Sequence, residues 1–280
     1  MAAYFHINYE FSREKALERI DARCARRDKS GHGVTQPQCS EDGRSRDRTC
    51  PAGPEEGAAY VCVADGNVLV QVHKDPEYRR IVQGAMFSIC DSSWVPLYLK
   101  RLYGFKPAQY SGSDIFRDIT GARKYKMAFL GSSEEVLDAL RSRLADEADP
   151  RIAEMPFLAL PFSKVEEFDY EGIAAQVNEA DPDIVWVALG APKQERFTSR
   201  LTPLLRRGVV IPVGAVFNFR AGLGIKRAPQ WMVRLHLEFL HRLWSEPRKQ
   251  LRRIGQILRY TPAILREARG SQTSDTQDVE

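Results

Sequence analysis

Short apolar runs alternate with helical stretches from Tyr60 onward, and this alternation predicts an α/β fold built on a Rossmann-like, doubly wound, mostly parallel sheet. Right-handed crossovers between parallel strands place helices on both faces of such a sheet. Beyond Gly222 the chain becomes basic, with apolar residues at helical spacing. This second pattern predicts a basic amphipathic helical appendage at the C-terminal end.

The strands of the predicted sheet are short runs rich in Val, Ile and Phe, and the helices have apolar residues at intervals of three or four. Strands are predicted at Tyr60–Ala64, Met86–Cys90, Lys126–Leu130, Pro156–Leu160, Ile184–Leu189 and Val209–Val213. Helices are predicted at Glu77–Gln83, Val95–Tyr103, Ser113–Thr120, Glu134–Ala145, Tyr170–Ala180 and Pro192–Arg206. Ligands of such folds bind beyond the carboxyl ends of the strands, so we expect the site there.

Composition divides the chain into five segments. Residues 1–22 contain a strand-like Tyr4–Ile7 and then a helical pattern. Residues 23–58 have Val34 as their only branched aliphatic residue, which predicts a disordered insert. The core at 59–223 precedes the appendage at 224–268 and a disordered tail at 269–280. The appendage is predicted to form helices at 229–245 and 247–260, each beginning at a proline, and Pro262 ends the second.

Composition also excludes several classes of protein. A chain of 280 residues with 43% hydrophobic residues is neither disordered nor fibrous. Its apolar runs reach about eight residues, whereas a bilayer-spanning helix needs about 20. The first residues lack a signal-peptide pattern, so we expect a cytoplasmic protein. Five cysteines without a C-x-x-C pair indicate neither a disulfide framework nor a zinc site.

Polar residues follow the first two predicted strands of the core. Asp65-Gly66-Asn67 has the letters of a plain turn. Asp91 follows Met86–Cys90, where a carboxylate is either a helix N-cap or a general base for an acceptor hydroxyl. Spacing alone does not decide between these two tasks.

Two glycine-containing junctions lie farther along the core. Gly131-Ser132-Ser133 either holds a phosphate at a helix start or forms a capping box between Ser132 and Glu135. The chain lacks both G-x-G-x-x-G and the P-loop pattern, so it carries neither fingerprint. Glycine in Val213-Gly214-Ala215 permits close approach of a ligand, and Arg227 suits a phosphate.

The most distinctive stretch runs from Asp183 to Glu195. A fully apolar strand ends at Gly190, and Pro192 begins a helix whose first turn displays Lys193, Gln194 and Glu195. A cation, an amide and a carboxylate at this edge suit a sugar nucleotide. The alternative is that Lys193 and Glu195 are solvated and Gln194 is only a cap.

These blocks together are similar to those of the WecG/TagA/CpsF glycosyltransferases, glycosyltransferase family 26. The resemblance spans about Tyr60–Pro262 and includes Asp65 with Asn67, Asp91, Gly112–Asp114, Pro156-Phe157, Pro182–Ile184, Gly190–Glu195, Val213–Ala215, Phe217, Ala221-Gly222, Arg227–Pro229, Leu237–Phe239, Arg242-Leu243 and Glu246–Arg248. The Pro-Lys-Gln-Glu and Arg-Ala-Pro blocks, in this order and at this spacing, are the most specific part.

The resemblance implies an inverting hexosyltransferase that works without a metal or other cofactor. Its donor is a UDP-sugar, commonly UDP-N-acetylmannosamine, and its acceptor is a sugar on undecaprenyl diphosphate. The products are intermediates of teichoic acid, enterobacterial common antigen, capsule or exopolysaccharide. It also implies peripheral contact with the anionic inner face of the plasma membrane, and a possible homo-oligomer.

Carried over residue by residue, the resemblance makes Asp91 the base and places Asn67 and Gln194 in the catalytic pocket. The residues expected to bind the substrate or nucleotide are Asp65, Gly112, Asp114, Gly131, Gly190, Lys193, Glu195, Gly214, Phe217, Arg227, Arg248, Arg252 and Arg253. Three positions depart from the pattern of many members: Asp65 stands where they have the Thr of a Thr-x-Asn, Ser92 follows Asp91 where they have Gly, and Gln109 stands where they often have Arg.

The C-terminal appendage is expected to contact an anionic partner, since residues 224–269 contain eleven Lys or Arg against three Glu. Its apolar residues Trp231, Leu235, Phe239, Leu243, Leu251 and Leu258 are expected to dock on the domain or lie in interfacial lipid. A nucleic-acid partner is not expected, because phosphate and anionic lipid account for the arginines and no nucleic-acid module is recognisable. A protein that binds a sugar nucleotide without turnover stays as the alternative function.

Overall fold

The computed structural model describes residues 2–25, 57–92, 94–223, 251 and 254–266. Its strands form one sheet in the order β1-β2-β4-β3-β8-β7-β5-β6, and every neighbouring pair is parallel except β1 with β2. The strands are β1 (Ala2–Tyr4), β2 (Ile7–Tyr9), β3 (Ala59–Ala64), β4 (Phe87–Cys90), β5 (Met127–Gly131), β6 (Phe157–Leu158), β7 (Ile184–Ala188) and β8 (Val209–Pro212). The predicted doubly wound, mostly parallel sheet and its six core strands are confirmed.

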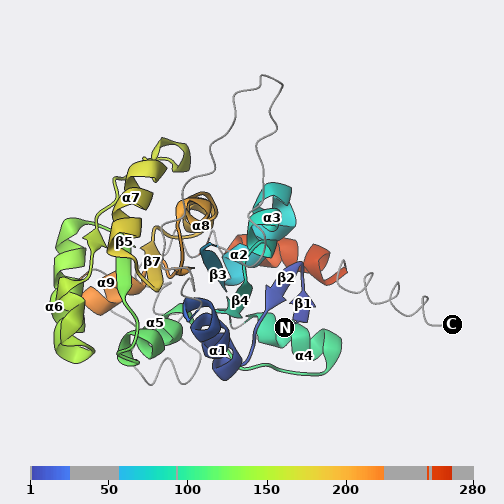
Figure 1. The fold of residues 1–280 in the computed structure, drawn as a ribbon. Helices are drawn as coiled ribbons and strands as arrows, with labels where there is room; N and C mark the ends of the chain where they lie inside the picture. Colours follow the sequence, from blue (N-terminus) through green and yellow to red (C-terminus); the bar gives the residue numbers. More distant parts are fainter. Residues whose placement is uncertain (1, 26–56, 93, 224–250, 252–253, 267–280) are drawn as a thin grey trace, which may run out of the picture.

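Helices cover both faces of this sheet (Figure 1). They are α1 (Arg13–Cys24), α2 (Gly66–Lys74), α3 (Pro76–Gln83), α4 (Trp94–Tyr103), α5 (Gly112–Gly121), α6 (Glu134–Glu147), α7 (Tyr170–Ala180), α8 (Lys193–Leu201) and α9 (Val216–Ala221), with short 3₁₀ turns at Pro150–Glu154, Val165–Glu167 and Thr202–Leu204. Helix α8 is shorter than the predicted Pro192–Arg206, because Pro203 has no N–H with which to continue the α-helical ladder.

Alternation along each strand divides the core between the two faces. Residues such as Val61, Phe87 and Trp186 pack against α1, α5, α6 and α9. Their neighbours point to the opposite face, where one apolar cluster joins β3 and β4 to α2, α3 and α4, and another joins β5, β7 and β8 to α7 and α8. The fold therefore has three layers, with two separate apolar clusters on the second face.

The N-terminal segment differs from the single strand predicted at Tyr4–Ile7. It forms an antiparallel hairpin of β1 and β2, and Phe5 and His6 at its turn both have positive φ, +54° and +62°. Such turns usually carry Gly or Asn, so nothing in the sequence marks this one. The helix that follows, α1, continues through Cys24, so the first two residues of the predicted insert are helical. Residues 57 and 58 lead into β3, and residues 26–56 lie outside the described part of the chain.

Helix α2 replaces the plain turn expected at Asp65-Gly66-Asn67. The carboxylate of Asp65 caps it by accepting hydrogen bonds from the backbone amides of Asn67 and Val68, each at 2.9 Å. The helix was missed because its valines are typical of strands. Burial of Val68 and Val72 against the sheet outweighs that preference.

Residues 254–266 form a helix that does not end at Pro262 as predicted. It continues because Ile264, beyond the proline, is buried in the cluster of α2 and α4. Leu251 and Leu258 are 60% and 58% exposed, so they do not dock on the domain; Ile257 and Ile264 face it instead. The other predicted helix, at 229–245, lies outside the described residues. Within the described part, no helix is long and apolar enough to cross a membrane.

Candidate active site

The carboxyl ends of β3 and β4 bring Asp65 and Asp91 to neighbouring positions. Ala64 pairs with Cys90 in the ladder, and the backbone amide of Asp91 donates to the Ala64 carbonyl at 3.1 Å. From β3 the chain adds β4 on one side of β3, and it then crosses to the other side of the sheet to form β5 next to β7. The direction in which strands are added therefore reverses after β4. Open α/β sheets bind their ligands at such a switch point.

Asp91 is held by the chain that leads into α5. The backbone amide of Gly112 donates to Asp91 Oδ1 at 3.3 Å, and Gln109 Nε2 donates to the Asp91 carbonyl at 3.2 Å. A Cβ at Gly112 would lie 3.2 Å from Val63 Cγ1, so glycine allows this close approach. The Asp91 side chain is partly exposed at the sheet edge, where a reactant can reach it. This is the placement required of a general base.

Asn67 lies in the first turn of α2, directly beside this carboxylate-bearing edge. The cap formed by Asp65 fixes the backbone of that turn, including the amide of Asn67. The C-terminal helix approaches the same turn: a Cβ at Gly66 would lie 2.9 Å from Ile257 Cδ1 and 3.8 Å from Ser92 Oγ. The N-terminal end of residues 254–266 therefore meets the carboxyl edge at Asp91.

Gln194 connects the ends of β7 and β8. Its Oε1 accepts from the Gly190 backbone amide at 3.1 Å, while a Cβ on Gly214 would lie 3.5 Å from the same oxygen. Both glycines have positive φ, +77° and +59°. Glycine at the two positions lets the backbone turn around the Gln194 side chain, which is itself buried, at 4% exposure.

Glu195 is not displayed at the surface as the sequence suggested. Its side chain is fully buried, and Gln194 Nε2 donates to Glu195 Oε1 at 2.8 Å. Burial raises the pKa of Glu195 to about 7; the nearby Asp65 carboxylate adds to the rise, and the Gln194 hydrogen bond opposes it. Glu195 therefore does not reach a ligand at this edge directly.

Lys193 occupies the rim of the site. Its Nζ lies 4.8 Å from the centre of the Phe168 ring and 5.4 Å from that of Phe162, a fully exposed side chain in the loop after β6. Cation–π contacts of this kind hold the ammonium group at the carboxyl edge. The interpretation that Lys193 is simply solvated is therefore incomplete.

Two predicted ligand-binding residues serve the fold instead. Phe217 is fully buried, with its ring 6.0 Å from those of Phe116 and Phe129, because α9 turns its apolar face to the sheet. Asp114 caps α5 in a capping box with Ser111 and pairs with Arg117 at 3.1 Å. Sequence similarity places both residues in family blocks, but it does not predict the direction in which their side chains point.

Gly131 and the serines after it also differ from the prediction. A Cβ on Gly131 would come within 2.7 Å of the Ala188 carbonyl oxygen, so close packing of β5 on β7 requires glycine here. The N-cap of α6 is Ser133, which accepts from the Val136 amide at 3.4 Å, and Ser132 takes a positive φ of +65°. The N-cap therefore lies one residue later than expected, and a single hydrogen bond from the Val136 amide to Ser133 takes the place of the expected capping box from Ser132 to Glu135.

Arg227, Arg248, Arg252 and Arg253 lie outside the described residues, so their predicted role stays a prediction. The part of the chain that the structure describes contains no group of three His, Cys, Asp or Glu side chains able to hold a metal. Sequence reasoning missed Tyr78, which lies against Glu195 and influences its pKa. No local signal marks it, because 117 residues separate the two.

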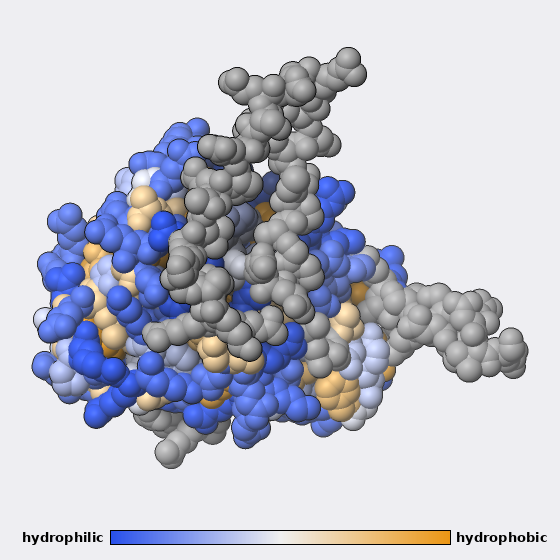
Figure 2. Space-filling view, viewed as in Figure 1, coloured by the Kyte–Doolittle hydropathy of each residue, from blue (hydrophilic) through white to orange (hydrophobic). Residues whose placement is uncertain are grey.

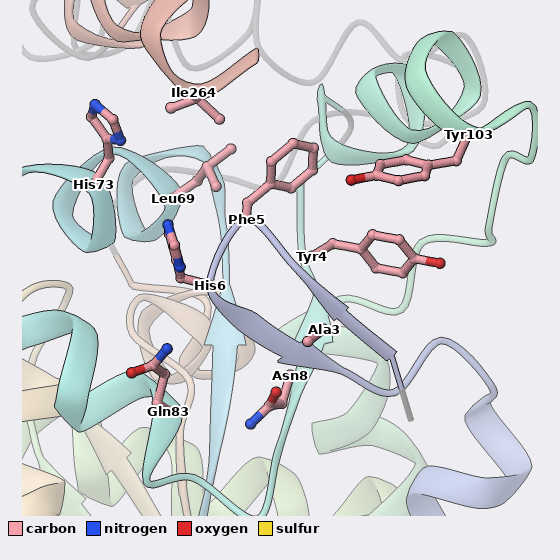
Figure 3. A pocket seen from close by; sticks show the side chains of 10 residues that line it. All are labelled: Ala3, Tyr4, Phe5, His6, Asn8, Leu69, His73, Gln83, Tyr103 and Ile264. Atoms are coloured by element: carbon pink, nitrogen blue, oxygen red, sulfur yellow. The ribbon is translucent and has the colours of Figure 1, made fainter. Parts of the chain in front are cut away.

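A pocket of about 250 Å³ lies at the other end of α2, between this helix and the N-terminal hairpin. In Figure 3, the side chains of Phe5 and Leu69 lie with Ile264 at one side of the pocket, and His6 and His73 come from the hairpin and α2. None of the predicted site residues lines it. The pocket is thus separate from the carboxyl edge that holds Asp91.

Comparison with known proteins identifies the family of the chain. The chain is 28% identical over 218 residues to the N-acetylglucosaminyldiphosphoundecaprenol N-acetyl-beta-D-mannosaminyltransferase of Bacillus subtilis (strain 168), covering 77% of this chain and 82% of the relative. The protein of the same name from Bacillus spizizenii is 26% identical over 217 residues, with 76% and 81% covered. The sequence model described as "Glycosyl transferase WecG/TagA/CpsF family" matches residues 47–274, most of the chain. The chain therefore belongs to the WecG/TagA/CpsF family of glycosyltransferases.

Proposed function

We propose that this glycosyltransferase moves a hexose from a UDP-sugar to a sugar carried on a polyprenyl diphosphate, with inversion at the anomeric carbon. The observation that carries the proposal is the partly exposed Asp91 carboxylate, held by Gly112 beside the first turn of α2. The printed name shared by the two Bacillus relatives supports the acceptor and an N-acetylmannosaminyl donor group.

In this reaction Asp91 accepts the proton of the acceptor hydroxyl as its oxygen bonds to the anomeric carbon. The bond from that carbon to the diphosphate oxygen breaks at the same time, and UDP leaves on the opposite face. Asn67, which follows β3, and Gln194, which follows β7, supply side-chain amide groups that bind the sugar in this proposal. The protonated Asp91 then returns its proton to solvent.

The departing diphosphate needs positive charge, which in this proposal comes from arginine. Arg227, Arg248, Arg252 and Arg253 are assigned this role by their match to the family blocks. The described helix 254–266 supports the assignment, because its first turns meet the carboxyl edge beside Gly66. No metal or other cofactor takes part in the proposed step.

Exposed apolar side chains support peripheral contact with a membrane, where a polyprenyl-linked acceptor resides. Leu251 and Leu258 lie seven residues apart, hence on one side of a helix, and both are more than half exposed. Leu97 on α4 is 49% exposed, and apolar side chains gather over α4 on the face shown in Figure 2. Leucines next to basic side chains are typical of helices that lie in the interface.

The test is UDP release by the purified full chain with a panel of UDP-hexoses, in the presence and absence of a lipid-diphosphate-linked amino sugar. We expect acceptor-dependent release that Asp91→Asn lowers by about 10²- to 10⁴-fold, the usual contribution of a general base. Asp138→Asn is the matched control, because Asp138 is 74% exposed on α6, away from this edge.

Two results would contradict the proposal. Full activity in Asp91→Asn would show that Asp91 is not the general base. A product that keeps the anomeric configuration of the donor would show that the reaction is not a single displacement. Nucleotide binding that persists without turnover for any donor and acceptor pair would favour the binding-only alternative.

A further inference from the structure

Two hydrogen bonds hold the Gln194 side chain, and both demand the same orientation of its amide. The Gly190 backbone N–H needs an acceptor and meets Gln194 Oε1 at 3.1 Å. The Glu195 carboxyl oxygen Oε1 accepts from Gln194 Nε2 at 2.8 Å. A flipped amide would set its NH₂ group against the Gly190 N–H and its oxygen against the carboxylate. Glu195 thus fixes, together with Gly190, the orientation of the buried Gln194 amide.

The other side of the Glu195 carboxyl is enclosed by protein. Its Oε2 is buried, and so are the hydroxyls of Tyr78 and Thr198; none of the three makes a hydrogen bond of good geometry. Tyr78 on α3 is close enough to affect the pKa of Glu195. A carboxyl group with one oxygen engaged and the other in a dry pocket holds a proton more readily than a solvated one.

The charged and titratable groups around Glu195 come from three elements. Asp65 and Cys62 approach from β3 and its end, and Tyr78 from α3. Arg196 follows Glu195 on α8, but its guanidinium pairs with Asp75 at 2.5 Å and Glu77 at 3.0 Å. Of these neighbours, Asp65 raises the pKa of Glu195 and adds to the effect of burial, whereas the Tyr78 hydroxyl lowers that pKa; burial outweighs the hydroxyl.

We propose that Glu195 is a positioning residue: in its ionised form it locks the Gln194 amide with its oxygen toward Gly190, and in its protonated form it loosens that lock. The ionised carboxylate accepts only, so a flipped amide meets repulsion on both sides. A protonated carboxyl can donate to a flipped amide oxygen, which removes one of the two constraints. Only the expected effect of Glu195 on turnover rests on the proposed transfer reaction; the expected effect on the Gln194 amide does not.

The pKa of Glu195, raised to about 7 by burial, places this change in the neutral range. Charge-assisted hydrogen bonds are about twice as strong as neutral ones, so the lock is tighter at alkaline pH. Glu195→Gln keeps the shape and an acceptor oxygen but has no proton to lose. The variant therefore separates ionisation of Glu195 from its packing.

The first measurement needs no substrate. The side-chain amide signals of Gln194, identified by their absence from Gln194→Ala, are followed by ¹⁵N–¹H NMR from about pH 5.5 to about pH 8.5, a range that spans the shifted pKa. We expect them to titrate near neutral pH in the wild type and to stay constant in Glu195→Gln. Glu166→Gln is the control, because the Glu166 carboxylate is 66% exposed and pairs with Arg200, which lies on α8 as Glu195 does.

The second measurement is kcat and KM for the donor across the same pH range. We expect kcat/KM of the wild type to rise through neutral pH and that of Glu195→Gln to stay flat, about tenfold lower at alkaline pH, the gap expected between a charged and a neutral hydrogen bond. A lost packing contact alone would lower kcat/KM equally at every pH.

Each result has a separate meaning. Gln194 signals that do not titrate, or that titrate alike in both proteins, would overturn the positioning role whatever the enzyme's turnover. Absence of turnover from every UDP-sugar would overturn the proposed reaction and leave the NMR titration to decide on Glu195. A pH profile shared by Glu195→Gln and the wild type would also overturn the positioning role.

Discussion

The backbone amide of Gly112 donates a hydrogen bond to Oδ1 of Asp91, so the first residue of α5 orients the proposed base at the end of β4. The contact joins residues 21 positions apart, across the loop that also carries Gln109. It depends on glycine, because a Cβ there would lie 3.2 Å from Val63 Cγ1. The position of α5 relative to β3 thus sets the orientation of Asp91.

Gly112→Ala keeps the backbone N–H as a donor but is expected to displace the start of α5, and that N–H with it. We expect a loss of about 1–2 kcal/mol in the free energy of unfolding, typical of overpacking, and a fall in kcat of about tenfold from the shifted carboxylate. Gly121→Ala, at the other end of α5, is the control, because a Cβ there meets nothing within 4 Å. Chemical unfolding and initial rates check both; equal effects of the two variants would contradict this account.

Gly131→Ala is expected to be much more harmful than an ordinary glycine substitution. Its φ is +104°, and the new Cβ would lie 2.7 Å from the Ala188 carbonyl oxygen, so β5 and β7 must separate. We expect a loss of about 3 kcal/mol or more. Gly104 also has a positive φ, +77°, but has open space around it, so Gly104→Ala should cost only about 1 kcal/mol of backbone strain. Thermal unfolding of the two variants compares them directly.

Glu195→Gln is expected to make stability less dependent on pH. The unfolded chain holds Glu195 at its ordinary pKa of 4.5 and the folded chain at about 7. Between these values the folded state binds more protons, so stability falls as pH rises, and the loss is complete above about pH 7. The full effect is about 3 kcal/mol.

The measurement for this prediction is urea unfolding of both proteins at several pH values. The gap between Glu195→Gln and the wild type should grow in favour of the variant from acidic to alkaline pH. A constant gap would show that Glu195 has the same pKa in both states.

Ile264→Ala and Leu258→Ala are expected to separate docking of the C-terminal helix from contact with lipid. Ile264 is 4% exposed in the cluster of α2 and α4, so its truncation should cost about 2–4 kcal/mol of stability. Leu258, 58% exposed, should change stability by less than about 0.5 kcal/mol but weaken flotation with anionic vesicles. Vesicle binding unchanged in a Leu251→Ala, Leu258→Ala double variant would contradict lipid contact by this face.

The sequence predicted the sheet well because its strands are buried on both faces and read as continuous apolar runs. The sequence-based prediction failed where burial outweighs local preference. In α2, Val68 and Val72 have side chains that favour strands, but they pack on the sheet from a helix. The hairpin turn at Phe5 and His6 carries no residue that marks positive φ. Tertiary packing decides these two elements, and local sequence does not record it.

The candidate site shows the same division. The positions of Asp91, Gln194 and Lys193 follow from the ends of predicted strands, whereas the contact of Gly112 with Asp91 was not predicted. The directions of side chains did not follow: Phe217 and Glu195 are buried, although both were expected to bind a ligand. Direction depends on which side of a helix meets the sheet, and a motif of a few letters does not contain that information.

The N-terminal hairpin protects the strand that carries Asp91. The family sequence model begins at residue 47, yet β2 pairs with β4 from far upstream and occupies its outer side. Without that pairing, the backbone amides and carbonyls of β4 would form an open template for strands of other molecules, a common origin of aggregation. A segment outside the region that the family model matches therefore covers this edge of the parallel sheet, and we expect its removal to promote aggregation.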